Sequence, residues 1–425
     1  MNKYLVTILI INLLHLNAHS QIFENYFLNS SLRVDYMHTA THDKELLSLD
    51  TYYHEPNWGG SQVNLIDTFD YGHYRFEVYD SLTNTLIYSR GYSTLCGEWR
   101  YTSEAKKTWR SFSESIILPF PKAPIKIVFF KRKINQTWKQ IFNIDITPSD
   151  YSIVPQLKTE LDAHRIHYSG NPSKKLDIVL LAEGYTKKEI KKFIKDAKRF
   201  ANYLFNCAPF DKMKTNINIW AVSSISSESG TDIPGEGIYK NTFFDSHFYT
   251  FGTERYINTV NNIAVRNAAA NAPYDQIYII ANTEKYGGAG IYNYYSICTS
   301  DHNLSDFVFI HELGHSFAGL GDEYIDKNVA VEDFYDLNTE PWEPNLTTLQ
   351  DFESKWKHLC DTITKIPTIY QNRQDKTVGA FEGAGYVTKG VYRPRSDCTM
   401  RSVNYNYFCP VCTKAIIDMI NFYSN

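Results

Sequence analysis

Two histidines four residues apart, with a glutamate directly after the first, are the residues of this chain whose types and spacing best suit a chemical reaction. They are His311, Glu312 and His315. On a helix, residues four apart lie one turn apart on the same face, so both imidazoles can reach one metal ion. Glu312 is then placed to accept a proton from an attacking water molecule. The pattern predicts a catalytic zinc site that carries its own general base.

The residues after this motif offer a carboxylate as the third zinc ligand. Gly319 allows a helix to end in the left-handed conformation, and Asp322 follows three residues later. In the metzincin pattern the third histidine also lies three residues after a glycine, although that glycine comes one residue earlier than here. Because carboxylate oxygen is an accepted zinc ligand, we predict Asp322 in this role, with Glu323 as the neighbouring alternative. A glutamate from a later helix, Glu332 or Glu340, is a third alternative.

Downstream of these residues, Met400 lies in the run Cys398-Thr399-Met400-Arg401. Metzincins carry a methionine in a tight turn beneath the metal, and Met400 is a candidate for that position. A lone methionine that only fills core space fits the same sequence. Both interpretations stay open at this point.

Seven cysteines leave at least one unpaired if the others form disulfides. They are Cys96, Cys207, Cys298, Cys360, Cys398, Cys409 and Cys412. The spacing of Cys409 and Cys412 is also that of a second metal site or a redox site. A structural zinc site needs four ligands, and the nearby sequence offers only Cys398 with Cys360 as a further candidate. We therefore favour a disulfide or buried thiols that hold the loop around Met400.

The segment ahead of the first histidine predicts a buried helix. Residues 306–310 are nearly all apolar, and a helix that is apolar on most sides lies in a protein interior. We expect Ser305 to cap its N-terminus and Asp306 to suit the positive end of the helix dipole. Histidine and glutamate are costly to bury in such a helix unless they are satisfied, and a metal ion satisfies them.

Strands and helices alternate from about residue 151 onward, which predicts an α/β domain. Thr186 and Glu189 have the spacing of a capping box, and apolar residues then recur at helical spacing as far as Leu204. A second helix is expected over Glu254–Ala270. The expected strands are Leu176–Ala182, Ile217–Ser223 and Gln276–Ala281.

Residues 286–297, between the last of these strands and the metal motif, are rich in glycine and tyrosine. In a metzincin-like domain the strand just before the zinc helix forms the sheet edge above the cleft, and an extended peptide can bind such an edge through backbone hydrogen bonds. The glycines would let a substrate backbone approach closely. A plain glycine-rich hairpin is the alternative.

The segment from Gln21 to Ser149 has short runs with strand character bounded by turn residues, which predicts a β-sandwich. The expected strands are Val63–Ile66, Tyr74–Val78, Leu86–Ser89, Ser115–Leu118, Ile125–Phe130 and Trp138–Ile144. No cluster of ligands is expected there, and the histidines interpreted as surface or structural residues are His42, His54 and His73. The predicted fold is α+β and multidomain: a signal peptide (1–20), an N-terminal β-sandwich (21–150) and a metallopeptidase-type catalytic domain (151–425).

The first twenty residues predict export. Lys3 precedes an apolar run from Leu5 to Leu14, and small residues follow up to an expected cleavage near Ser20, as in a secretory signal peptide. The run is too short to span a membrane. No cysteine lies at the expected cleavage site, which excludes a lipid anchor on that residue. We expect a periplasmic, cell-surface or extracellular location.

The composition is that of an ordinary globular protein. The 425 residues suffice for two domains, with 43% hydrophobic and 21% charged residues. A formal net charge of −4 gives no sign of a basic surface, so nucleic acid is not an expected partner. We expect no transmembrane span and a monomeric protein.

The run from His311 to Tyr324 resembles the IgA-peptidase family of secreted bacterial zinc metallopeptidases. Further segments that resemble this family are Gly97–Trp99, Leu176–Tyr185, Ser229–Pro234, Cys398–Met400 and Phe408–Cys412. The similarity covers nearly the whole mature chain. It implies a metzincin-like catalytic domain, one zinc ion and endopeptidase chemistry. It does not imply that immunoglobulin A is the substrate of this chain.

The expected function is that of an exported zinc-dependent endopeptidase acting on an extended peptide segment of a protein or glycoprotein. A catalytically inactive surface or glycoprotein-binding protein with the same fold is the alternative, although a purely structural zinc site has no need of Glu312. We expect the N-terminal domain to place substrate or to bind host polymers. A chain that begins near Tyr151 is then expected to keep zinc and some activity.

Overall fold

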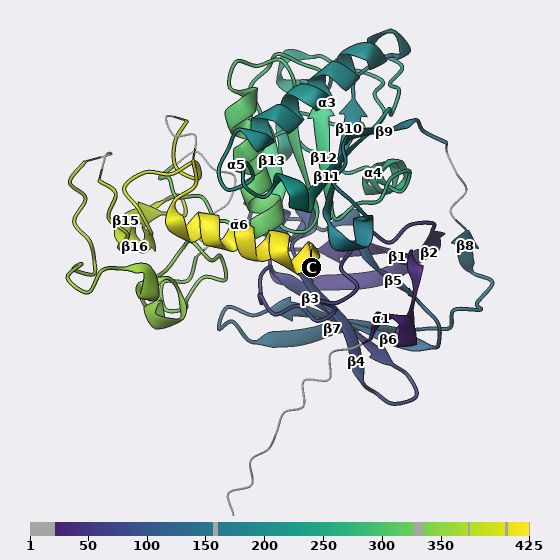
Figure 1. The fold of residues 1–425 in the computed structure, drawn as a ribbon, viewed down its shortest axis with the longest axis horizontal. Helices are drawn as coiled ribbons and strands as arrows, with labels where there is room; N and C mark the ends of the chain where they lie inside the picture. The colour runs from purple at the N-terminus through teal and green to yellow at the C-terminus, as the bar shows by residue number, and fades with distance from the viewer. Residues whose placement is uncertain (1–21, 156–159, 327–334, 373–374, 404–406, 425) are drawn as a thin grey trace, which may run out of the picture.

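The computed structural model describes residues 22–155, 160–326, 335–372, 375–403 and 407–424. Within these ranges the chain is a mixed α+β protein whose strands form four sheets. The largest sheet and its helices lie at the top of the view in Figure 1, and the two N-terminal sheets lie below it. A small two-stranded sheet, β15 (Phe381–Ala384) and β16 (Val387–Arg393), lies to one side.

Two four-stranded sheets form the N-terminal part, with the strand orders β5-β1-β2-β8 and β4-β3-β6-β7. Apolar side chains of both sheets, such as Leu32 and Val34 from one and Phe76 and Val78 from the other, belong to one buried cluster. Two short helices, α1 (Phe23–Tyr26) and α2 (Leu95–Trp99), accompany them. The strands are β1 (Phe27–Ala40), β2 (Glu45–Glu55), β3 (Tyr74–Asp80), β4 (Leu86–Tyr92), β5 (Arg110–Pro121), β6 (Ile125–Arg132), β7 (Trp138–Ile146) and β8 (Ile153–Pro155).

The sequence prediction omitted β1 and β2, and buried charges explain why. Arg33 of β1 is fully buried, with Nε 3.0 Å from Asp35 and Nη1 2.9 Å from Glu55. Such charged residues interrupt the apolar pattern that marks a core strand, although each charge has a partner in the fold. The predicted strand Val63–Ile66 was wrong. The Ser61 hydroxyl accepts hydrogen bonds from the next backbone amides of that segment, which makes it a turn.

The six-stranded sheet has the order β13-β14-β12-β10-β11-β9, with four parallel inner strands and an antiparallel strand at each edge. Alternate residues of β10 face opposite sides. Ile178 and Leu180 belong to the cluster with α3, α5 and α6, whereas Val179 and Leu181 belong to the cluster with α4. The elements are β9 (Ala163–His167), β10 (Leu176–Glu183), α3 (Ile190–Phe205), β11 (Ile217–Val222), α4 (Asn262–Ala269), β12 (Gln276–Ala281), β13 (Gly288–Ile291), β14 (Tyr295–Thr299), α5 (Ser305–Ala318) and α6 (Pro410–Tyr423).

Several predicted elements of this part are confirmed, and two boundaries differ. The capping box ahead of α3 is present, with the Thr186 amide 2.9 Å from Glu189 Oε2. The helix expected over Glu254–Ala270 begins only at Asn262, because the Asn261 side chain caps it. Ser305 is the first residue of α5 and not its N-cap. Its hydroxyl instead donates to the Thr299 carbonyl at 2.7 Å, which ties the helix to the end of β14.

A shared core joins the N-terminal part to the six-stranded sheet. Leu95, Trp99 and Phe112 lie in the same buried cluster as Val179 and Leu181 of β10. The chain passes from the N-terminal sheets to the six-stranded sheet between β8 and β9, because β8 pairs with β2 whereas β9 pairs with β11. The division into domains at residues 150 and 151 stays a prediction.

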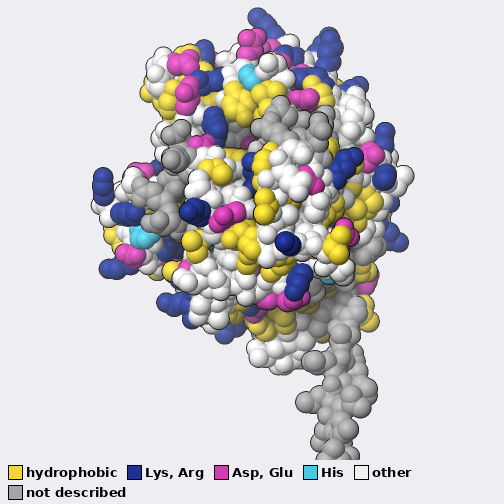
Figure 2. Space-filling model, turned by 90° about the vertical axis from the view of Figure 1, so that its left-hand side faces the viewer, with side chains coloured by type: hydrophobic (Ala, Val, Ile, Leu, Met, Phe, Trp, Pro, Cys, Tyr) yellow, Lys and Arg dark blue, Asp and Glu magenta, His cyan; other side chains and the backbone are white. Residues whose placement is uncertain are grey.

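None of the helices in the described part of the chain combines the length and the apolar character needed to cross a membrane. The predicted signal peptide lies outside the described residues. On the face drawn in Figure 2, acidic and basic side chains are interspersed with hydrophobic ones, in keeping with the small net charge.

Candidate active site

The α5 helix and the loop after it bring three potential ligands together. His311 and His315 lie one turn apart on α5, and their Nε2 atoms are 3.1 Å from each other. Gly319 ends the helix with φ of +64°, which turns the chain back. Asp322 then places Oδ1 3.1 Å from Nε2 of His311 and 3.3 Å from Nε2 of His315.

The second nitrogen of each imidazole faces a backbone carbonyl. His311 Nδ1 lies 3.0 Å from the Thr399 oxygen, and His315 Nδ1 lies 2.5 Å from the Leu320 oxygen. A carbonyl only accepts, so Nδ1 carries the hydrogen in both rings and the neutral tautomer leaves Nε2 with a lone pair. Both lone pairs therefore face the same point as Asp322 Oδ1.

This arrangement fits a metal cation better than it fits protein hydrogen bonds. Asp322 Oδ1 is buried without a hydrogen-bond partner among the described residues, whereas Oδ2 accepts from the Tyr386 hydroxyl at 2.5 Å. Burial disfavours the charged imidazolium, but the Asp322 carboxylate outweighs burial and raises the pKa of His315 to about 9. The site thus attracts positive charge. Two imidazole lone pairs and a carboxylate oxygen are a common ligand set for a divalent metal ion.

Glu312 lies beside these ligands but does not belong to the ligand cluster. Its side chain lines the same cavity, which has a volume of about 500 Å³. Burial raises the pKa of the Glu312 carboxyl, and His311 and His315 oppose that rise. A carboxylate whose proton affinity is raised, next to a candidate metal site and open to a cavity, is suited to accept and return a proton.

The edge strand β13 runs directly against α5, and its glycines make this approach possible. A Cβ atom on Gly290 would lie 2.2 Å from the Glu312 carbonyl oxygen, and one on Gly288 would lie 2.7 Å from Glu312 Oε1. The sequence suggested that these glycines make room for a substrate backbone. In the structure they make room for the helix that carries Glu312.

Met400 is completely buried beneath the metal motif. A Cβ on Gly314, within the motif, would lie 2.7 Å from Met400 Sδ. The methionine therefore occupies the space that a glycine leaves free on α5. Both interpretations of the sequence, a methionine turn and a core-filling side chain, fit this position.

Two of the alternative ligands, Glu323 and Glu340, lie outside the cluster of His311, His315 and Asp322. Glu323 is buried in a cluster with Cys398, Cys409 and Cys412. Glu340 Oε2 instead lies 3.2 Å from the Thr348 hydroxyl and 3.1 Å from the Asp351 amide. Glu332 lies outside the described residues. The geometry thus supports Asp322 as the third ligand.

Sequence reasoning missed that the N-terminal part contributes to the cavity. Glu98 of α2 lines it, and Tyr256 donates a hydrogen bond to the Glu98 carboxylate. Burial raises the pKa of Glu98 to about 7. His73 also lines the cavity, and burial lowers its pKa to about 3, which keeps the ring neutral. Glu98 lies in the segment Gly97–Trp99, but nothing in one sequence places that segment next to residue 312.

A second correction concerns clustered ligands in the N-terminal part, where none was expected. His38, Cys96 and Glu114 lie together there, fully buried. His38 makes close contacts through both ring nitrogens, to Glu114 at 2.9 Å and to Glu45 at 3.2 Å. These contacts satisfy the imidazole, so the cluster is a hydrogen-bonded part of the core.

Two family models match this chain. The model described as IgA Peptidase M64 matches residues 165–376 and 369–420, and the model described as Peptidase M64 N-terminus matches residues 22–143. No curated protein matches the chain. The first model spans more than half of the sequence and includes the α5 motif, Asp322 and the cysteines near the C-terminus. The chain therefore belongs to the IgA peptidase M64 family, a family of metallopeptidases.

Proposed function

We propose that this protein is a zinc-dependent endopeptidase whose metal is held by His311, His315 and Asp322. One observation carries the proposal: two imidazole nitrogens and a buried carboxylate oxygen converge on one point, with the Glu312 carboxyl beside them in an open cavity. A zinc ion there would supply Lewis acidity toward water and toward the peptide carbonyl. A purely structural site has no use for a free carboxylate or a cavity.

Glu312 acts as the general base and then as the general acid. It accepts a proton from the water that attacks the peptide carbonyl, and it passes this proton to the departing amine. Desolvation favours the protonated form of Glu312, so the carboxyl holds the proton between the two steps. Asp322 and the two imidazoles stay fixed during the reaction, because Tyr386, Thr399 and Leu320 hold their outer atoms.

The substrate is an extended peptide segment that lies along the outer edge of β13, beyond the bridge that Gly288 forms with Tyr256. This strand pairs with β14 on one side, and residues 288–291 line the cavity. Backbone groups at a sheet edge bind an extended chain without regard to its sequence. Glu98 and Arg255 also line the cavity and would contact side chains near the cleaved bond. The substrate class is protein or glycoprotein, and immunoglobulin A is not assumed.

The proposal also covers the details of the fold and the cellular location of the protein. The two N-terminal sheets share one core, which supports a β-sandwich. The α5 motif, the αL turn at Gly319 and the buried Met400 support a metzincin-like catalytic domain over residues 151–425. We propose that residues 1–20 are a cleaved signal peptide and that the mature chain acts as an exported monomer.

The test is cleavage of a proteome-derived peptide library by the purified mature chain, with sequencing of the new termini. We expect internal cleavage that stops with a zinc chelator and returns when zinc is restored. Cleavage that persists after the zinc has been removed would contradict a metallopeptidase. Binding to secreted glycoproteins without any cleavage would instead favour the inactive binding protein.

A further inference from the structure

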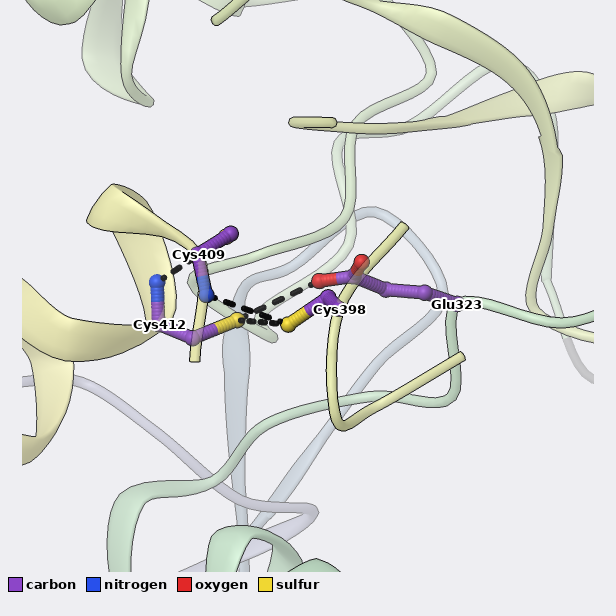
Figure 3. A group of neighbouring side chains, drawn as sticks. All are labelled: Glu323, Cys398, Cys409 and Cys412. Carbon is purple, nitrogen blue, oxygen red and sulfur yellow. Dashed lines mark hydrogen bonds between the residues drawn. The ribbon is translucent and has the colours of Figure 1, made fainter. Parts of the chain in front are cut away.

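A second cluster of metal-binding side chains lies behind the active site. It comprises Glu323, Cys398, Cys409 and Cys412, and one ligand atom from each residue lies within 4.8 Å of all the others. Figure 3 shows the Glu323 carboxylate and the Cys398 and Cys412 thiols pointing toward one another. All four residues are completely buried. We call this group the Cys3Glu cluster.

Two distances within the cluster are close to those of tetrahedral coordination. Zinc–sulfur bonds of about 2.3 Å and zinc–oxygen bonds of about 2.0 Å place neighbouring ligand atoms roughly 3.5–3.8 Å apart. Cys398 Sγ and Cys412 Sγ are 3.9 Å apart, and Cys412 Sγ is 3.2 Å from Glu323 Oε1. Both distances are close to the edge lengths of such a tetrahedron.

Backbone amides donate hydrogen bonds to two of the sulfur atoms. The Cys409 amide lies 3.2 Å from Cys398 Sγ, and the Cys412 amide lies 3.5 Å from Cys409 Sγ. Cys409 is the N-cap of α6, and Cys412 lies in its first turn. The positive end of the helix dipole and these amides favour thiolate, which is the form that binds metal.

Protein groups alone leave this cluster incompletely satisfied. Glu323 Oε1 accepts from the Asn345 side chain at 3.0 Å, but Oε2 is buried and has no hydrogen-bond partner among the described residues. A disulfide between two of the three thiols would leave the third thiol and this oxygen unchanged. An ion coordinated by all four residues compensates the three sulfur atoms and the charge of the buried Glu323 carboxylate.

We infer that Glu323, Cys398, Cys409 and Cys412 hold a second, structural zinc ion. Zinc suits the set because it accepts both thiolate sulfur and carboxylate oxygen in tetrahedral geometry. Four protein ligands in a closed, buried position leave no site for water, which distinguishes this centre from the catalytic one. The sequence alone favoured a disulfide or buried thiols because it did not identify Glu323 as a fourth ligand.

The second ion would fix the parts that form the active site. Glu323 directly follows Asp322, and Cys398 lies two residues before Met400. The two loops are also joined by the Glu323 amide, which donates to the Met400 carbonyl at 2.8 Å. The loop of Cys398 carries the Thr399 carbonyl that orients His311. The ion therefore connects the third catalytic ligand, the methionine turn and α6.

The other thiol-containing cluster shows why proximity alone is not sufficient. His38, Cys96 and Glu114 are equally close, but they provide three ligands, and His38 already contacts Glu114 and Glu45. The Cys3Glu cluster has four ligands and a buried oxygen without a donor.

Zinc content of the full mature chain tests the inference, with variants that separate the two sites. We expect two zinc ions per wild-type chain and one in the double variant His311→Ala/His315→Ala. Cys398→Ser and Glu323→Gln should each lose the second ion, whereas Cys360→Ser, a thiol outside the cluster, should keep both. After cobalt substitution, the histidine variant should show thiolate-to-cobalt charge-transfer absorption in the near ultraviolet.

The histidine variant makes the result independent of the proposed function and of how well the cysteine variants fold. One zinc per wild-type chain, lost in the histidine variant, would overturn the second site. Thiol titration of the denatured, chelator-treated chain adds a further check. All seven cysteines should react. Five reactive thiols, which is seven minus the two of a disulfide, would overturn the inference in favour of a disulfide.

Discussion

The two nitrogens of each candidate active-site histidine have different partners. Nδ1 donates to a backbone carbonyl, of Thr399 for His311 and of Leu320 for His315, and Nε2 faces Asp322. The carbonyls fix both the tautomer and the ring orientation, so the lone pairs converge before any ion binds. Such outer contacts commonly change metal affinity by about 10- to 100-fold when they are lost. Substitution of residues that never touch the metal should therefore change the metal affinity.

Glu312→Gln should separate proton transfer from metal binding. Glutamine keeps the volume and the hydrogen-bonding reach of glutamate but does not accept the proton. Because Glu312 lies outside the ligand cluster, we expect full zinc content and a turnover reduced by at least about 100-fold. His311→Ala should lose catalytic zinc and activity together. Elemental analysis and peptide cleavage measure both; loss of zinc from the glutamine variant would make Glu312 a ligand.

Tyr386→Phe tests the support of the third ligand. The Tyr386 hydroxyl donates to Asp322 Oδ2, and without it this buried oxygen loses its donor. We expect zinc affinity to fall by about 10- to 100-fold, with the fold preserved. Competition with a chelating dye measures the affinity. The exposed Tyr239→Phe is the matched control, and equal affinities of the two variants would show that Tyr386 does not position Asp322.

At the scale of elements, the sequence predicted α5 well, and the candidate ligands lie together in the structure because their spacing is local. Both histidines, Glu312 and the turn at Gly319 lie within nine residues, and helical geometry fixes their relation. Glu98, by contrast, reaches the cavity from α2, more than 200 residues earlier in the chain. Glu323, the alternative third ligand, lies with three cysteines that one sequence could not place beside it, since they come from loops that only the fold brings together.

Strand β13 offers a test of how closely the sheet edge approaches α5. A Cβ on Gly290 would overlap backbone atoms of Glu312, whereas one on Gly288 would meet the side chains of Val308 and Glu312. Backbone cannot move aside as a side chain can. We expect Gly290→Ala to destabilise the protein by about 1–3 kcal/mol in denaturant unfolding. Gly288→Ala should cost less stability but reduce turnover, because it displaces the Glu312 carboxyl. Equal stability of Gly290→Ala and wild type would contradict the close packing.

At the scale of the whole molecule, the N-terminal part and the catalytic part share a buried core and a cavity, and each part supplies residues to both. The buried cluster on the α4 side of β10 includes Leu95, Trp99 and Phe112 from the N-terminal part. Arg33 donates to Asn267, and Asn64 donates to the Phe422 carbonyl at the end of α6. Glu98 enters the active-site cavity itself. A role limited to substrate placement or anchoring does not require contacts of this kind.

The shared core reverses the expectation for a chain that begins near Tyr151. Removing residues 21–150 takes Leu95, Trp99 and Phe112 out of the core. Burial of each large apolar side chain contributes about 1.5–3 kcal/mol, or roughly 5–9 kcal/mol for the three. This is comparable to the whole stability of a typical domain, about 5–15 kcal/mol. We expect the 151–425 fragment to aggregate and to hold little catalytic zinc.

Co-expression of residues 21–150 and 151–425 as separate chains provides the control for this truncation. If the shared core is what the short fragment lacks, the two fragments should elute together in size-exclusion chromatography with restored zinc content and cleavage. Trp99→Ala in the N-terminal fragment should weaken that association, because Trp99 is fully buried in the shared cluster. A 151–425 fragment that is monomeric, zinc-loaded and as active as the full chain would show instead that the catalytic part folds and works alone.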